Sequence, residues 1–541
     1  MPKLPEHLRG LLQPDAYPHP VRDIRVIETH ISWVLLTGDF AYKLKRPVHY
    51  SFIDQRDPER RAFLCAEELR LNRRFAPQLY LGVSRIVATP DGLRVQDDGP
   101  AVEHAVRMRQ FDGDEQLDRL IDSARIDAGE LEDFGRDLAD IHARLPVADS
   151  GPWGTFTSVR AQIHANVAEC RQAVCATAAE EVGAIADVLD SWLPGLAPTI
   201  CERLAQHRVR ECHGDLHARN LLRHEGRIIA FDCLEFEPDF RWIDVAEEVA
   251  FLWMDLVARG RPDLAQAFLS GYLEQGGDYG LCRLLTLYAA HRALVRAKVA
   301  ALEGGAGSGQ RCGAYLHCAS ELLARGRPRL VVMQGLSGSG KTWLARQLAQ
   351  RLGAIHLRSD RERKRQAGLA ASADSHAGLG RDLYAPGATQ QIYERLAGCA
   401  SSILAGGFPV IVDATFLRRA ERRRFRELAA ARGVDMVVIP CQAPAAVLEA
   451  RILERRARRR DASEADIEVL DWQRQGIEPL LANERLDVIR ADSTSPNVVA
   501  EVLAQLGAAS GAQRAFDALC VAHRPRQVTQ LAGGGVEHVV E

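Results

Sequence analysis

Short apolar runs separated by turn residues mark the first hundred positions of the chain. Four of these runs have the length of strands, at residues 30–36, 40–48, 83–88 and 102–108. The turn signal at 37–39 separates the first two runs. Between the second and third runs, residues 57–74 are rich in Arg, Glu, Leu and Ala, and Pro58 lies where a helix can begin. The pattern predicts a β-rich segment in the order strand, strand, helix, strand, strand.

From about residue 130 the apolar spacing changes to three and four residues. Five apolar side chains follow this helical period: Leu131, Phe134, Leu138, Ile141 and Leu145. A strand–loop–strand passage at about 209–233 interrupts the helices, which continue to about residue 324. We therefore expect a small β-rich lobe at about 25–110 and a helical lobe at about 111–325.

A third pattern begins after a linker at 325–329. Short apolar runs alternate there with helical stretches, and the runs lie at 330–334, 354–357, 409–412, 436–440 and 487–490. This alternation is typical of a parallel α/β sheet flanked by helices. We expect one domain over residues 1–325, a second over 326–508, and a poorly ordered tail over 509–541.

Composition places the 541-residue chain among folded proteins, with 47% hydrophobic and 26% charged residues. This excludes intrinsic disorder as the main state. The net charge of −3 argues against a uniformly basic protein that coats nucleic acid. Residues 1–325, however, carry 38 basic and 48 acidic side chains, a balance of −10, whereas residues 326–541 carry 31 and 24, a balance of +7. The two halves are chemically different, and we expect their sites to prefer acceptors of different charge.

The cysteines and the N-terminus give an expectation about compartment. Twelve cysteines are scattered without a CxxC pair, so we expect neither a disulfide framework nor structural zinc. Residues 1–20 lack the apolar core of a signal peptide, and no run of 18 residues is apolar enough to span a bilayer. We expect a protein of the reducing cytoplasm, without a membrane partner.

Residues 335–342 read GLSGSGKT and fit the phosphate-loop pattern G-x-x-x-x-G-K-[ST], between a predicted strand and a predicted helix at 343–352. The backbone N–H groups of such a loop and the helix N-terminus bind phosphate oxygens. Lys341 would reach the β- and γ-phosphates of ATP, and the Thr342 hydroxyl would bind Mg²⁺. The ATP-binding residues expected here are Gly335, Ser337, Gly338, Ser339, Gly340, Lys341 and Thr342. A flexible connector with a chance lysine is the alternative.

Carboxylates follow the second and third strands of this half. Because the carboxyl ends of parallel strands face the ligand crevice, Asp360 could accept a proton from a substrate hydroxyl, and Arg363 could bind an anionic group. This arrangement, with Asp413-Ala-Thr415 after the third strand, resembles P-loop kinases of the polynucleotide-kinase, gluconate-kinase and zeta-toxin type over about 328–500. The resemblance implies a Mg²⁺ or substrate contact for Asp413 and a substrate contact for Thr415. The alternatives are a helix N-cap for Asp360 and a plain strand-end carboxylate for Asp413.

An arginine-rich run at 451–460 precedes a helix-start signal at 463–466. In kinases of the type just named, a basic lid closes over the triphosphate, and guanidinium groups suit this role because they donate to phosphate oxygens in pairs. Arg451 and Arg455 are the expected ATP contacts. A solvated helix face is the alternative for each arginine.

The N-terminal half carries a second constellation. His213-Gly214-Asp215 is followed by Asn220, and Asp232 comes twelve residues later. Phosphoryl transfer needs a carboxylate near the acceptor hydroxyl and oxygen ligands for Mg²⁺, so Asp215 would be the base, and Asn220 and Asp232 the metal ligands. The pattern resembles the aminoglycoside-phosphotransferase and choline-kinase group of protein-kinase-like enzymes. A chance occurrence in a structural loop is the alternative.

Upstream residues agree with this resemblance, which spans about 25–300 and implies a two-lobed kinase-like fold. Lys43 lies where the fold places the lysine of the α- and β-phosphates, and Lys45 shares its strand face. Glu68 or its neighbour Glu67 would pair with that lysine, with a solvent-exposed charge as the alternative for either.

Two further roles follow from the same resemblance. Residues 107–111 would form the hinge that meets the adenine ring, and Asp244 would brace the catalytic loop. Two features depart from the family pattern: the turn over the nucleotide contains only Gly38, and Asp232 is followed by Cys233.

Together these observations predict an ATP- and Mg²⁺-dependent phosphotransferase with two nucleotide-binding domains, which transfers the γ-phosphate to a hydroxyl of a small-molecule acceptor. The whole chain resembles a bacterial fusion of an aminoglycoside-phosphotransferase-like domain with a P-loop kinase. One alternative is a regulatory protein that binds nucleotide without turnover in one or both domains. Another is a kinase of nucleic-acid or nucleotide ends, acting through the basic C-terminal half. Because no aromatic cluster for base stacking accompanies the arginines in the sequence, a small-molecule acceptor ranks first.

Overall fold

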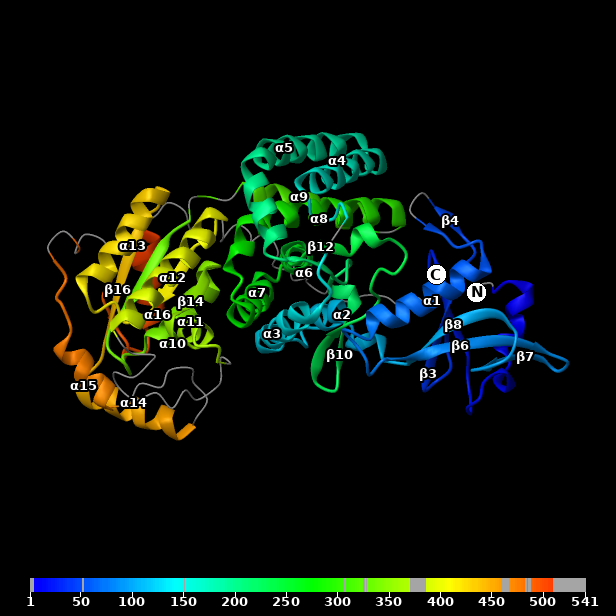
Figure 1. The fold of residues 1–541 in the computed structure, drawn as a ribbon, viewed down its shortest axis with the longest axis horizontal. Coiled ribbons are helices and arrows are strands. Elements are labelled where there is room, and N and C mark those ends of the chain that lie inside the picture. Colours follow the sequence, from blue (N-terminus) through cyan, green and yellow to red (C-terminus); the bar gives the residue numbers. More distant parts are fainter. Residues whose placement is uncertain are drawn as a thin grey trace, which may run out of the picture.

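The computed structural model describes residues 4–508 except 51–52, 150, 306, 325, 327, 370–385, 459–466, 482–483 and 485–487. The predicted tail at 509–541 and the helix-start signal at 463–466 lie outside the described residues. An antiparallel sheet, a body of helices and a second sheet with its own helices follow one another along the long axis of the molecule (Figure 1). We call residues 4–323 the N-terminal part and residues 328–508 the C-terminal part.

The first sheet is antiparallel and has six strands in the order β1-β2-β3-β8-β6-β7. Its strands and the two-stranded ribbon beside it are β1 (Arg25–Glu28), β2 (Ser32–Leu36), β3 (Phe40–Lys45), β4 (His49–Tyr50), β5 (Ile53–Asp54), β6 (Tyr80–Thr89), β7 (Gly92–Gln96) and β8 (Ala101–Arg109). Asp57 is the N-cap of helix α1 (Pro58–Asn72), and its side chain accepts a hydrogen bond from the Glu59 N–H. The helix packs against β8 and β6. The four predicted strands are present. Strand β1 was not predicted, because it is mostly exposed and has no apolar run. The short strands β4, β5 and β7 were not predicted either.

The helical body consists of helices that pack around long buried faces. They are α2 (Leu117–Asp122), α3 (Ala128–Arg144), α4 (Phe156–Ala173), α5 (Ala176–Ala205), α6 (Val245–Ala258), α7 (Pro262–Gly276), α8 (Cys282–Glu303) and α9 (Ser308–Leu323). Helices α3 and α7 approach closely because glycines lie at their contact: a Cβ at Gly135 would come 2.2 Å from the Phe268 carbonyl oxygen, and one at Gly271 would come 2.0 Å from that of Glu132. No helix among the described residues combines the length and apolarity needed to cross a bilayer.

Two short antiparallel pairs of strands interrupt these helices and hold the two ends of the 213–220 loop. The strands are β9 (Val209–Glu211), β10 (Leu221–His224), β11 (Arg227–Ala230) and β12 (Trp242–Asp244), with β9 paired to β12 and β10 to β11. The loop leaves β9 and enters β10, while Asp232 follows the end of β11. The 213–220 loop, Asp232 and strand β3 of the first sheet therefore come together, although they are far apart in the sequence.

The second sheet is parallel, as predicted, with the order β14-β15-β13-β16-β17. Its elements are β13 (Leu330–Gln334), α10 (Lys341–Leu352), β14 (Ile355–Arg358), α11 (Ser359–Gln366), α12 (Pro386–Ala405), β15 (Val410–Asp413), α13 (Arg419–Arg432), β16 (Met436–Gln442), α14 (Ala445–Arg458), α15 (Ile467–Gln475), β17 (Ala491–Asp492) and α16 (Val498–Ala508). The chain leaves β13 first toward β14 and β15 and later toward β16, so a ligand crevice is expected at the carboxyl end of β13.

The last predicted strand, at 487–490, was placed too early. Residue 487 lies outside the described residues, Val488 forms an isolated bridge with Val438, and the strand β17 begins at Ala491. The segment is short and mixes charged with apolar residues, so the spacing of its apolar residues does not indicate where the strand begins.

One large buried apolar cluster includes side chains of both parts, and smaller clusters lie within each part. The Trp253 ring of α6 packs edge-on against Phe408, with ring centroids 5.7 Å apart. Gln266 on α7 donates a hydrogen bond to the Ala354 carbonyl oxygen at 2.6 Å. The contact between the parts is therefore packed like a protein interior.

Candidate active sites

The phosphate loop lies between β13 and α10, at the crevice of the parallel sheet. Gly338 has φ +80°, and a Cβ there would come 2.6 Å from the Leu448 carbonyl oxygen, so only glycine fits this turn. Lys341 begins α10, and its Nζ donates to the Leu336 carbonyl oxygen at 2.9 Å, within the loop. Burial lowers the pKa of Lys341 from its ordinary value. The ammonium group therefore lies against the loop that would receive phosphate.

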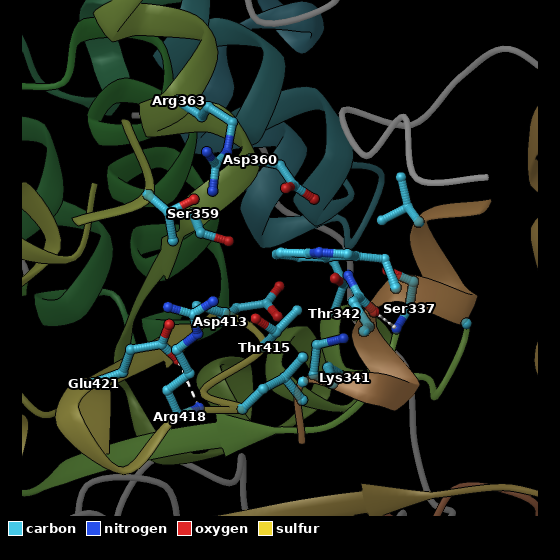
Figure 2. A pocket seen from close by; sticks show the side chains of 18 of the residues that line it. Ser337, Lys341, Thr342, Ser359, Asp360, Arg363, Asp413, Thr415, Arg418 and Glu421 are labelled. Carbon is cyan, nitrogen blue, oxygen red and sulfur yellow. Dashed lines mark hydrogen bonds between the residues drawn. The ribbon is translucent and has the colours of Figure 1, made fainter. Parts of the chain in front are cut away.

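A cavity of about 450 Å³ opens beside this loop and is lined by the candidate residues of the C-terminal part except Gly335 and Ser339. Figure 2 shows Asp360 and Arg363 projecting from α11 on one side, and Lys341 and Thr342 on the other. Asp413, at the end of β15, lies between the two groups, and Thr415 follows it (Figure 2). The structure thus brings the predicted residues of three strand ends to one cavity.

Asp413 is buried, and its charge is maintained by its neighbours. His356 Nε2 lies 3.3 Å from the Asp413 carboxylate. Burial alone would raise the pKa of Asp413, but the hydrogen bond and charge of His356, with the charge of Lys341, lower it to about 2. Asp413 is therefore a carboxylate at neutral pH, and it lines the same cavity as Thr342.

Asp360 lies in the first turn of α11, after the N-cap residue Arg358. The N-cap role weighed for Asp360 is therefore wrong, because the helix begins before this residue. The carboxylate lines the cavity instead, as does the Arg363 side chain one turn later. The Thr415 hydroxyl belongs to the lining of the cavity as well and lies 3.3 Å from the Tyr393 hydroxyl.

Arg451 and Arg455 also line the cavity, from α14. The Arg451 guanidinium donates to the Gly338 carbonyl oxygen at 3.3 Å and to the Ser493 hydroxyl at 2.8 Å, so it is fixed against the phosphate loop. Gln473 of α15 accepts a hydrogen bond from the Ser337 N–H at 2.8 Å. Helices α14 and α15 therefore both bind the loop. The side chains of 456–460 lie outside the described residues.

Two tryptophans that were not predicted as site residues line the same cavity. Trp343 in α10 is 53% exposed and Trp472 in α15 is 44% exposed. The position of Trp343 directly after Thr342 was a signal that could have been used, because that residue must lie at the cavity edge. Trp472 is 129 positions further on, and only the fold places it there. The arginines are therefore accompanied by aromatic rings in space, although not in sequence.

In the N-terminal part, Asp215 lies in the 213–220 loop with its side chain 29% exposed. The Asn220 amide donates to the Asp215 carboxylate at 2.9 Å, and His217 Nε2 lies 3.3 Å from it. Burial would raise the pKa of Asp215, but the charge and hydrogen bond of His217, with the charge of Arg296, hold it below its usual range. The candidate base is thus ionised and oriented.

Lys43 of β3 binds two carboxylates, Glu68 of α1 at 2.9 Å and Asp232. Lys45, two residues on, is fully buried and pairs with the other oxygen of Glu68 and with Glu235. The two lysines therefore share Glu68, whose pKa is lowered to about 2, because their charges outweigh the effect of burial. Only Lys43 also reaches Asp232.

Glu67 points elsewhere and pairs with Arg70 and Arg241. Of the two glutamates left open by the sequence, Glu68 therefore faces the lysines.

The predicted hinge at 107–111 ends in Phe111, whose ring packs edge-on against the Phe231 ring, with ring centroids 5.1 Å apart. The Gln110 side chain accepts a hydrogen bond from the Gly38 N–H at 3.0 Å, which closes this turn onto the hinge.

The brace of the 213–220 loop is Glu248, and the prediction of Asp244 was wrong. The two carboxylate oxygens of Glu248 accept the N–H groups of His213 at 2.6 Å and Gly214 at 3.0 Å. Asp244 instead caps α6 and pairs with Arg203. The residue that braces the loop lies one turn further along α6, where its side chain faces the loop.

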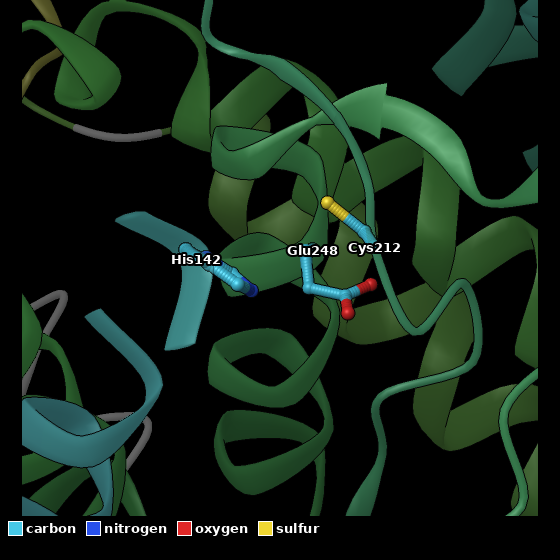
Figure 3. A group of neighbouring side chains, drawn as sticks. All are labelled: His142, Cys212 and Glu248. Atoms are coloured by element: carbon cyan, nitrogen blue, oxygen red, sulfur yellow. The ribbon is translucent and has the colours of Figure 1, made fainter. Parts of the chain in front are cut away.

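His142 and Cys212 lie beside Glu248, and their donor atoms are within 4.8 Å of one another (Figure 3). This donor set resembles those of zinc sites. Both Glu248 oxygens already accept main-chain N–H groups, however, and the Arg74 guanidinium lies 3.3 Å from the Cys212 carbonyl oxygen. A cation bound by these three side chains would be repelled by the Arg74 charge. We therefore assign Glu248 to holding the loop and not to binding a metal ion.

The residues present fit ATP and Mg²⁺ at both sites. Hard oxygen donors, the ligands that Mg²⁺ prefers, are available from Thr342 and Asp413 in one part and from Asn220 and Asp232 in the other. The loop glycines and Lys341 offer N–H groups to phosphates, and Lys43 offers an ammonium group.

The model of the phosphotransferase enzyme family matches residues 42–285, and that of an AAA domain matches residues 330–480. Two uncharacterized proteins, of Mycobacterium tuberculosis (strain ATCC 25618 / H37Rv) and Mycobacterium bovis, are each 32% identical over 456 residues, which is 82% of this chain and 89% of theirs.

Among solved structures, a gluconokinase from Sinorhizobium meliloti 1021 is 23% identical and covers 36% of this chain and 99% of its own, with a TM-score of 0.25. Choline kinase from Cryptosporidium parvum Iowa II is 13% identical and covers 56% of this chain and 90% of its own, with a TM-score of 0.35. The mycobacterial relatives match along most of their length, across both family segments. The chain therefore belongs to the family of these mycobacterial proteins, in which a phosphotransferase-family segment is followed by a P-loop kinase segment of the AAA type.

Proposed function

We propose that this protein is an ATP- and Mg²⁺-dependent phosphotransferase with two nucleotide-binding domains, each of which transfers a γ-phosphoryl group to a hydroxyl of a small-molecule acceptor. One observation carries the proposal: in both parts a carboxylate lies beside a cluster of phosphate-binding and oxygen-donor groups. We place the domain boundary at residue 325, with domains at 1–325 and 326–508, and the protein in the cytoplasm.

In the C-terminal site, Lys341 and the loop N–H groups bind the phosphates, and Arg451 and Arg455 cover them from α14. Thr342 and Asp413 would hold Mg²⁺, which would neutralise charge on the phosphoryl oxygens. Asp360 accepts the proton of the acceptor hydroxyl as the oxygen–phosphorus bond forms and the bond to the leaving ADP oxygen breaks. Arg363 and Thr415 orient the acceptor.

In the N-terminal site, Asp215 accepts the acceptor proton. Asn220 holds that carboxylate and, with Asp232, supplies oxygen ligands for the metal ion. Lys43 binds the α- and β-phosphates and is positioned by Glu68. Glu248 keeps the loop in place through two main-chain N–H groups.

The test uses purified full-length protein with isotopically labelled ATP and a panel of hydroxylated metabolites. We expect labelled products that disappear in two separate groups, one in Asp215→Asn and one in Asp360→Asn. Lys43→Ala should abolish the products that Asp215→Asn abolishes, and Lys341→Ala those that Asp360→Asn abolishes, because each lysine change removes a phosphate contact at the corresponding site. If the wild type labels no acceptor, or if neither aspartate change reduces labelling, the proposal fails.

The two exposed tryptophans favour a second candidate for the C-terminal site, an acceptor that ends in a nucleotide. Base stacking on an aromatic ring contributes about 1–3 kcal/mol per base. Including nucleosides, nucleotides and short oligonucleotides in the panel tests this candidate. A preference for oligonucleotides that weakens steeply with salt would support it.

A further inference from the structure

Helix α11 faces two ways. Asp360 and Arg363 line the cavity of the C-terminal site, whereas Arg361 and Arg365 contact the end of α7 in the N-terminal part. The helix has only eight residues, so it cannot hold its own position without tertiary contacts. The contacts of its outer side therefore decide where its inner side points.

Glu274, in the last turn of α7, is the main contact. One carboxylate oxygen lies 3.1 Å from the Arg358 guanidinium and 3.0 Å from that of Arg361. The three side chains are 13%, 14% and 17% exposed, so water screens these pairs only in part. Arg358 ends β14 and Arg361 lies in the first turn of α11, on either side of Asp360. The carboxylate thus holds the junction from which Asp360 projects.

The end of α7 supplies a second contact. The last carbonyl groups of a helix have no partner within it. Arg365 donates to two of them, the carbonyl oxygens of Gln275 at 2.7 Å and of Glu274. Gly277 follows with φ +67°, and a Cβ there would come 2.4 Å from Arg365 Nε. The helix end is therefore shaped to receive this arginine.

Helix α11 is also bound within the C-terminal part. Glu362 is buried and pairs with Arg365 at 3.2 Å and with Arg395 of α12 at 2.6 Å. Helix α12 in turn contacts the segment before α8. The charges of Arg358, Arg361, His356 and Arg136 surround Glu274 and lower its pKa to about 2, against the effect of burial. Glu274 is therefore ionised at every pH at which the protein is assayed.

We propose that Glu274 is a positioning residue for the C-terminal site: the N-terminal part holds α11 so that Asp360 and Arg363 face the acceptor. Phosphoryl transfer at the phosphate loop then depends on a side chain of the other part. The catalytic consequence rests on the proposed function, whereas the structural consequence does not.

The experiment compares Glu274→Gln with Glu132→Gln in the full-length chain. Glu132 is the matched control because it is 14% exposed and also forms an ion pair across the two parts, with Arg346 of α10. It shares Arg136 with Glu274, but among the described residues no ion pair joins it to α11. Hydrogen–deuterium exchange of the amides at 359–366 is measured first. We expect exchange at least tenfold faster in Glu274→Gln and unchanged exchange in Glu132→Gln.

The second readout is transfer of label from ATP to the best acceptor that depends on Asp360. We expect kcat to fall at least tenfold in Glu274→Gln with the KM for ATP unchanged, and Glu274→Asp to recover part of the loss because it keeps the charge. Melting temperatures of both glutamine variants show whether the loss follows general destabilisation.

Unchanged exchange at 359–366 in Glu274→Gln would overturn the inference, and so would equal acceleration in Glu132→Gln. If Asp360→Asn leaves all transfer intact, the proposed function of this site fails. The exchange measurement decides the positioning role in that case as well.

Discussion

Lys43 and Asp232 form an ion pair between strand β3 and the end of β11. These two residues are our candidates for binding phosphate and metal, so each neutralises the other. In Asp232→Asn, Lys43 keeps Glu68 and gains freedom to bind phosphate. We expect ADP binding without Mg²⁺ to stay the same or strengthen, and Mg²⁺-dependent transfer at the N-terminal site to fall at least about 100-fold, because a metal contact of several kcal/mol is lost.

Calorimetry with ADP, with and without Mg²⁺, measures the first effect, and transfer of label measures the second. Asp54→Asn serves as the control, because Asp54 forms an exposed pair with Arg56 away from the site. Retention of full Mg²⁺-dependent activity in Asp232→Asn would contradict the assignment.

Lys45 should matter for stability. Its side chain is fully buried between Glu68 and Glu235, and Lys45→Met would leave Glu235 without its counter-charge beside Glu68, which keeps Lys43. Breaking a buried ion pair on one side costs about 3–5 kcal/mol. We expect a clear fall in melting temperature by calorimetry, whereas Arg56→Ala, at an exposed pair, should change it little. Equal falls in melting temperature in Lys45→Met and Arg56→Ala would contradict this prediction.

Glu248 gives a pH dependence with a defined sign. Burial raises its pKa from 4.5 to about 7, so the folded protein binds an extra proton between these pH values. The stabilising contribution is full below pH 4.5 and is lost as the pH rises through 7. Glu248→Gln does not titrate, so its stability relative to wild type should rise by up to about 3 kcal/mol across this window. Urea unfolding at several pH values checks this, and parallel stability curves would disprove it.

Trp343 should contribute to acceptor binding. Stacking on an exposed ring is worth about 1–3 kcal/mol, which corresponds to roughly a 5- to 150-fold change in affinity. In Trp343→Ala we expect the KM for the acceptor of the C-terminal site to rise within this range, with the KM for ATP changed less than threefold. Phe63→Ala is the control, because Phe63 is equally exposed but lies on α1. A rise confined to the KM for ATP would assign the ring to the nucleotide instead.

Gly406 should tolerate no side chain. A Cβ there would come 2.0 Å from the Cys282 carbonyl oxygen, across the contact between the two parts. Because the neighbour is backbone, Gly406→Ala must separate the parts, and we expect a loss of more than about 2 kcal/mol. Gly398→Ala, in α12, meets nothing within 4 Å and should raise stability slightly. Calorimetry compares the two, and similar melting temperatures would contradict the prediction.

The sequence predicted the elements around the phosphate loop closely because their signals are local. β13 begins and ends where its apolar run does, and Lys341 and Thr342 occupy the start of α10. Asp215 and Asn220 are likewise close in sequence, and their hydrogen bond follows from a single tight loop. Motif spacing is informative wherever the interacting residues lie within one turn or one loop.

The remaining features depend on contacts between distant segments, which spacing does not encode. Asp244 and Glu248 are both acidic residues near the start of α6, and only the packing of that helix determines which one faces the loop. The pairs of Glu274 with Arg358 and Arg361 join residues more than eighty positions apart. Charge totals indicated two different halves but gave no sign that they share a buried surface.

The shared apolar cluster has a consequence for how the two halves can exist. A chain cut near residue 328 loses a covalent link, but Trp253, Phe408 and the surrounding side chains still bury the same surface. The fragments should therefore remain together as a noncovalent pair after proteolysis. Each half expressed by itself would expose this surface to water and aggregate, whereas co-expression of both fragments should restore a soluble complex.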